Sequence, residues 1–82
     1  MLTTKPADFT DRMNAAVVIK LNGDPHEIPA PVSVAGLLAS LDIDPRRVAV
    51  EHNLVIVKKD AFERTTVGEG DEIEIVNFVG GG

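Results

Sequence analysis

Cysteine is absent from the 82-residue sequence. A chain without cysteine forms no disulfide, no thiolate metal site and no cysteine nucleophile, and it has no thiol of its own that could hold sulfur. Any chemistry of this chain that involves sulfur must therefore use another of its groups.

Basic residues are few and scattered. Eight lysines and arginines stand against thirteen acidic residues, so the formal net charge is -5. No basic stripe could follow a phosphate backbone, and nucleic acid is therefore not expected as a partner. The acidic surface serves mainly to keep the domain soluble, and it could also steer the domain toward a basic patch on another protein.

Long hydrophobic runs are absent as well. Residues 1–16 lack the continuous apolar core of a secretory signal, and no later run approaches the length of a transmembrane helix. We therefore expect a cytoplasmic chain that makes no membrane contact and is a monomer when free. Its 82 residues fit one small domain, which rarely holds a deep catalytic cleft.

Signatures of metal and nucleotide sites are also missing. The histidines His26 and His52 lie far apart without ligand-spaced partners, so no metal site is predicted, and His52 is expected in a solvated loop. No glycine-rich phosphate loop is present, so the chain should not bind a nucleotide tightly by itself. Glu72 and Glu74 share a strand face, which is far more often solvated than catalytic. We expect no bound cofactor, no catalytic residue and therefore no enzyme.

A hairpin and a helix are predicted in the first half of the domain. The β-branched run at 17–21 precedes Asn-Gly-Asp at 22–24, which is typical of a hairpin turn. The returning strand, around 26–28, is expected to be short because prolines at 25, 29 and 31 cannot donate ladder hydrogen bonds. Ser33 is a candidate N-cap for a helix that ends near Leu41. The apolar stripe of that helix consists of Val34, Leu37, Leu38 and Leu41.

Three further strands are predicted at 48–50, 54–57 and 72–76, with a polar connection at 58–64 from which Phe62 enters the core. In the last strand Ile73 and Ile75 face one way. Val76 and Phe78 face the other way, toward the less buried side, where they could form a docking patch. This order predicts an α+β roll, in which a mixed sheet of four to five strands packs on one helix.

The chain ends in three glycines. We divide the sequence into a poorly ordered leader at 1–16, a globular domain at 17–79 and a glycine tail at 80–82. In the tail, 80–82, the lack of side chains would allow extended backbone to enter a narrow channel. Val79 to Gly82 could reach about 14 Å into a partner at about 3.6 Å per extended residue. The terminal carboxylate of Gly82 would then be the reactive group, once a partner that binds ATP had activated it.

Two stretches, 41–51 and 70–82, resemble the sulfur carrier proteins of thiamine biosynthesis. The resemblance extends from about Val17 to the end of the chain and implies the ubiquitin-like β-grasp fold. It also implies that Gly82 is adenylated by an activating enzyme and converted to a thiocarboxylate with sulfur from a cysteine desulfurase route. Thiazole synthase would then receive the sulfur.

We assign the residues before Gly82 to partner binding, and Gly81 together with Gly82 matches the family's terminal glycine pair. Gly81, Gly80 and Val79 form the tail that enters the partner, and Phe78 and Val76 belong to the docking surface. The sequence departs from the family in two loops: Asn53-Leu54 stands where Asn-Gly is common, and Lys58-Lys59 where Pro-Arg is common. Both departures concern loop geometry and leave the acceptor glycine unchanged.

Other functions remain open from the sequence. The small subunit of molybdopterin synthase shares the fold and the thiocarboxylate, but the approach at 76–79 resembles the thiamine branch more closely. A ubiquitin-like protein modifier would join Gly82 to lysines. A plain binding module would use only the face of Val76 and Phe78. Copurification with a large synthase subunit would indicate the molybdopterin branch. A ladder of conjugates would indicate the modifier, and function without Gly81 and Gly82 would indicate the plain binding module.

Overall fold

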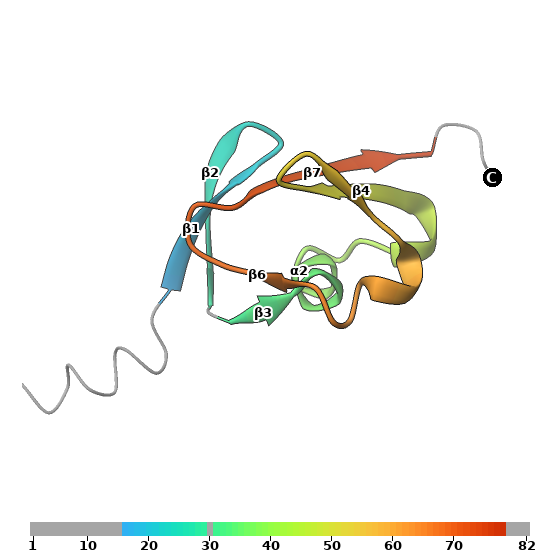
Figure 1. Cartoon of the computed structure of the whole chain (residues 1–82), viewed down its shortest axis with the longest axis horizontal. Coiled ribbons are helices and arrows are strands. Elements are labelled where there is room, and N and C mark those ends of the chain that lie inside the picture. Colours follow the sequence, from blue (N-terminus) through green and yellow to red (C-terminus); the bar gives the residue numbers. More distant parts are fainter. Residues whose placement is uncertain (1–15, 30, 79–82) are drawn as a thin grey trace, which may run out of the picture.

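The computed structural model describes residues 16–29 and 31–78. Within them, a five-stranded mixed sheet packs on one α-helix, beside which lies a sheet of two short strands (Figure 1). The large sheet has the order β2-β1-β7-β4-β5, with β1 parallel to β7 and the other neighbours antiparallel. The predicted α+β β-grasp fold is confirmed. The expected leader and glycine tail lie outside the described residues, except Ala16, which begins β1.

The first hairpin joins β1 (Ala16–Leu21) to β2 (Asp24–Pro29). Its turn is as predicted: Asn22 and Gly23 have φ of 50° and 88°, the left-handed conformation that asparagine and glycine tolerate. The prediction of a short second strand is wrong, because β2 has six residues and contains two prolines. β2 is an edge strand and pairs only with β1 in this sheet. A proline on its open side therefore removes no hydrogen bond between strands.

The helix α2 (Val34–Ser40) begins and ends where the sequence predicts. The hydroxyl of Ser33 accepts a hydrogen bond of 3.0 Å from the amide of Gly36, and Leu41 forms the C-cap. A Cβ at Gly36 would lie 2.7 Å from Cγ2 of Val32. The position therefore favours glycine for its close contact, which explains why the glutamate of a capping box is not found there.

The second half of the sheet consists of β4 (Val48–His52), β5 (Val55–Val57) and β7 (Glu72–Asn77). These strands confirm the three predicted ones, with a change at Leu54, which lies in the turn and not in β5. Its φ of 71° is left-handed, an unusual conformation for a leucine. The Asn53-Leu54 turn therefore adopts positive φ at both positions without the usual glycine.

Several short elements were not predicted. Strands β3 (Val32–Ser33) and β6 (Thr66–Val67) pair antiparallel next to α2, and 3₁₀ helices η1 (Pro45–Arg47) and η2 (Lys59–Ala61) flank β4 and β5. Elements of two or three residues are too short to show a period in the sequence. No helix in the described ranges is long and apolar enough to span a membrane.

The hydrophobic core lies between α2 and the inner face of the sheet. Phe62 is 3% exposed, which confirms the prediction that its side chain lies in the core although its neighbours in the sequence are polar. Ile73 is fully buried on the central strand of the sheet. Eight further side chains complete the core: Ile19, Ile28, Val34, Leu37, Leu38, Val48, Val50 and Val67. Because Ile73 belongs to β7, the strand before the tail is fixed in the core.

Candidate functional site

Strand β7 carries the residues that precede the glycine tail. It runs between β1 and β4, and in Figure 1 it extends along β4 to the end of the sheet where η1 lies. Val76 and Phe78 are 58% and 51% exposed, as predicted from the alternation. Val79 to Gly82 lie outside the described residues, so their roles stay predictions.

Val76, near the end of β7, shares the outer face of the sheet with a residue of β5. Val76 is opposite Ala49, and Ile56 is opposite Glu51, so all four point away from the core that Val50 occupies. Ile56 is 71% exposed. We name Ile56, Val76 and Phe78 the outer apolar patch. The sequence did not reveal that Ile56 belongs to it, because a three-residue strand shows no alternation.

The end of β7 is held against η1. The amide of Phe78 donates to the carbonyl of Arg47 at 2.9 Å. The Nζ of Lys59 donates to the carbonyls of Val48 and Pro45 at 2.9 and 3.2 Å, and it lies 5.0 Å from the centroid of the Phe78 ring. Both the backbone and the side chain of the last described residue are therefore in contact with neighbouring elements.

Two asparagines in left-handed turns bind β7 from opposite edges. The amide of Asn22 donates to the carbonyl of Ile73 at 2.8 Å, and its Oδ1 accepts from the amide of Ile75 at 2.7 Å. On the other edge, the amide of Asn53 donates to the carbonyl of Glu72 at 2.7 Å, and its Oδ1 accepts from the Glu72 amide at 2.8 Å. Each asparagine thus extends a ladder beyond its own strand. The sequence indicated both turns but not these contacts.

A second cluster ties the β4–β5 turn to the turn before β7. The prediction that His52 is a solvated loop residue is wrong: it ends β4, its side chain is 24% exposed, and its Nε2 donates to Oδ2 of Asp71 at 2.8 Å. Asp71 also accepts from the amide of Gly68 at 2.9 Å and from Nδ2 of Asn53 at 3.3 Å. Burial raises the pKa of Asp71, but these three hydrogen bonds outweigh it and lower the pKa below the ordinary value.

Comparisons with known proteins agree with this geometry. The model of the ThiS family matches residues 19–82. The chain belongs to the ThiS family. A crystal structure of the thiamine biosynthesis protein ThiS from Geobacter metallireducens is 33% identical, with a TM-score of 0.71, and the alignment covers 80% of this chain and 100% of that one. The resemblance inferred from the sequence is therefore confirmed.

Curated relatives of this ThiS family chain are of two sizes. The sulfur carrier protein ThiS of Bacillus subtilis is 40% identical over 50 residues, which are 61% of this chain and 76% of that protein. A thiazole synthase of Paramagnetospirillum magneticum is 45% identical over 62 residues, which are 76% of this chain. The chain spans only 19% of the length of that protein and 20% of a thiazole synthase from Magnetococcus marinus.

The Asp-Pro-Arg-Arg stretch of this ThiS family chain comprises the whole of η1 and its N-cap, Asp44. Oδ1 of Asp44 accepts from the amide of Arg46 at 2.9 Å, and Oδ2 accepts from the guanidinium of Arg46 at 2.9 Å. These hydrogen bonds lower the pKa of Asp44 to about 2. The capped turn fixes Arg47, whose carbonyl accepts from Phe78, so the motif supports the end of β7.

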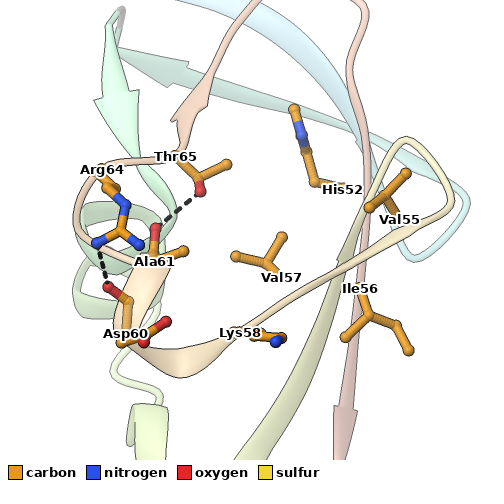
Figure 2. A pocket seen from close by; sticks show the side chains of 9 residues that line it. All are labelled: His52, Val55, Ile56, Val57, Lys58, Asp60, Ala61, Arg64 and Thr65. Carbon is orange, nitrogen blue, oxygen red and sulfur yellow. Dashed lines mark hydrogen bonds between the residues drawn. The ribbon is translucent and has the colours of Figure 1, made fainter.

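A shallow groove of about 350 Å³ lies between the β4–β5 hairpin and the connection that follows it (Figure 2). Figure 2 shows the Thr65 hydroxyl directed at the carbonyl of Ala61, at 2.8 Å, and the Arg64 guanidinium at the carbonyl of Asp60, at 2.9 Å. Both hydrogen bonds join residues within the connection at 58–65 and so stabilise its turns. Among the described residues, no group of three or more His, Asp or Glu could hold a metal ion.

Acid should weaken the fold of this ThiS family chain through Asp71. Since its folded pKa is lowered, its contribution to stability is present above the unfolded pKa of about 3.9 and is lost as the pH falls through the folded value. We expect Asp71→Asn to lower the free energy of unfolding by about 1–3 kcal/mol at pH 7. The difference from wild type should shrink below about pH 4, measured by urea unfolding at several pH values. A pH-independent difference would contradict this assignment.

Proposed function

We propose that this chain is a sulfur carrier for the synthesis of the thiazole ring of thiamine, with Gly82 as the residue that holds the sulfur. The observation that carries the proposal is a family match that runs through Gly82, on a domain whose strand β7 is fixed up to Phe78. The chain has no cysteine, so a carboxylate is the group left to hold transferable sulfur. The domain acts as a carrier in the cytoplasm and leaves the catalysis to its partners.

The chemistry requires activation because a carboxylate is a poor electrophile. An activating enzyme that binds ATP joins the Gly82 carboxylate to AMP, and pyrophosphate leaves. The terminal sulfur of a persulfide, supplied by a cysteine desulfurase route, then attacks the acyl carbon, and AMP departs with the electrons of the broken C–O bond. A second thiol of the sulfur donor attacks the donor sulfur of the resulting acyl disulfide. The thiocarboxylate leaves with the electrons of the broken S–S bond, and the donor is left as a disulfide. Gly81, Gly80 and Val79 bring this group to the reacting centre, where the two glycines, which have no Cβ, suit a narrow channel.

The partner surface is the outer apolar patch. Exposed large apolar side chains on an otherwise charged domain commonly mark contacts with other proteins, and Val76 and Phe78 lie next to the tail. Thiazole synthase is the acceptor that we propose. This proposal is supported by a protein named thiazole synthase, 19% of whose length is a segment similar to this chain. A carrier-like segment is thus part of the same polypeptide as the rest of that protein.

The test is intact-protein mass spectrometry. The chain is incubated with a candidate activating enzyme, ATP and a sulfur donor, with an ATP-free control. We expect a mass change of one sulfur for one oxygen, confined to the C-terminal fragment and dependent on ATP. No change with an activating enzyme that loads a known carrier would contradict the proposal. A ladder of conjugates would indicate a modifier, and copurification with a large synthase subunit would indicate the molybdopterin branch.

A further inference from the structure

The ammonium group of Lys59 lies where η2, η1 and the end of β7 meet. Besides its hydrogen bonds to the carbonyls of Val48 and Pro45, its Nζ lies 5.0 Å from the ring centroid of Phe78 and 5.7 Å from that of Phe62. Both distances are within the range at which a cation is attracted to an aromatic face. The carbonyls fix the cation, and the cation in turn attracts both rings.

The two rings depend on Lys59 to different degrees. Phe62 is 3% exposed, so packing in the core fixes its ring whether or not a cation is present. Phe78 is 51% exposed, and its backbone is tied to η1 by one hydrogen bond of 2.9 Å to Arg47. A half-exposed ring is not held by burial alone. The attraction to the ammonium group therefore counts for more in the orientation of the Phe78 ring than in that of the Phe62 ring.

We propose that Lys59 is a positioning residue: it fixes the ring of Phe78, the last described residue before the glycine tail, in the orientation that the activating enzyme contacts. This inference rests on the proposed function of Gly82. A side chain that is oriented before binding loses less conformational entropy when the partner contacts it. Lys59 should therefore lower the KM of the carrier for its activating enzyme and leave kcat unchanged, because the bound carboxylate occupies the same place with or without it.

The test compares Lys59→Met with two matched variants. Methionine keeps the length of the side chain and removes the charge, Lys59→Arg restores a cation that can donate hydrogen bonds, and Lys58→Met removes the charge of the adjacent exposed lysine. We expect Lys59→Met to raise KM about three- to tenfold, with kcat within about twofold. Lys59→Arg should have a KM close to that of wild type, and Lys58→Met should behave as wild type.

A second measurement does not depend on sulfur loading. Three-bond NMR couplings report the χ1 rotamer of Phe78, which we expect to be single in wild type and Lys58→Met and averaged in Lys59→Met. A single rotamer in Lys59→Met would overturn the inference, as would an averaged rotamer with an unchanged KM. If wild type accepts no sulfur, the proposed function fails, and the rotamer still decides whether Lys59 positions Phe78.

Discussion

A chain shortened by removal of Gly82 is expected to lose sulfur loading by at least about a hundredfold, because a reacting group displaced by even 1 Å can lose that much rate. Deleting one residue moves the terminal carboxylate back by about 3.6 Å if the tail is extended. The last described contact of the domain, at Phe78, fixes the origin from which this reach is counted. Loading is measured by intact mass after incubation with the activating enzyme, ATP and a sulfur donor.

Matched variants can separate the effect of the length of the tail from the effect of the width of the partner's channel. Addition of one alanine after Gly82 moves the carboxylate forward, whereas Gly82→Ala keeps its distance and adds only a Cβ. We expect the extended chain to be as inactive as the shortened one, and the substituted chain to lose activity if the channel admits no side chain. All three should keep the thermal midpoint of wild type. Continued function after loss of Gly81 and Gly82 would favour a plain binding module, and a melted fold would disprove the separation of tail and domain.

The parts of the fold that the sequence predicted have a period or a turn signal. Alternation in Glu72 to Val76 placed Ile73 in the core and Val76 outside it, and the structure agrees. Ser33 was identified as an N-cap because its hydroxyl satisfies an amide at the helix start. Asn22 with Gly23 indicated the first turn. In each of these cases, residues close together in the sequence determine the structure.

The parts that the sequence did not predict depend on contacts between distant residues. His52 and Asp71 are 19 positions apart, so nothing near His52 showed that it would be hydrogen-bonded. Lys59 is another case. The sequence relates its departure from the family pattern only to loop geometry, whereas its ammonium contacts the ring of Phe78 because η2 and the end of β7 meet. The candidate site was therefore predictable along β7, but not in the groups that orient its end. The roles of the tail residues stay predictions.

Two phenylalanines flank Lys59, and truncating them should have opposite consequences. Phe62→Ala removes a ring that is 3% exposed, and we expect it to lower the free energy of unfolding by about 3–5 kcal/mol. That loss is a large part of the total stability expected of a domain of this size, which is about 4–12 kcal/mol. Phe78→Ala removes a ring that is 51% exposed, and it should change stability by less than about 1 kcal/mol. Urea unfolding followed by circular dichroism measures both.

The functional readout should reverse this order. Phe78→Ala removes the ring that Lys59 orients and part of the outer apolar patch, so it should raise the KM for sulfur loading several-fold in a fully folded protein. Because Phe62→Ala is expected to lose much of the stability of the domain, Phe62→Leu serves as the more stable variant of the core position, since leucine keeps more of the apolar volume than alanine. Its KM should match wild type. If Phe62→Leu impaired loading as much as Phe78→Ala, the core and the tail would be coupled, and a domain that merely presents its reactive end would be the wrong description.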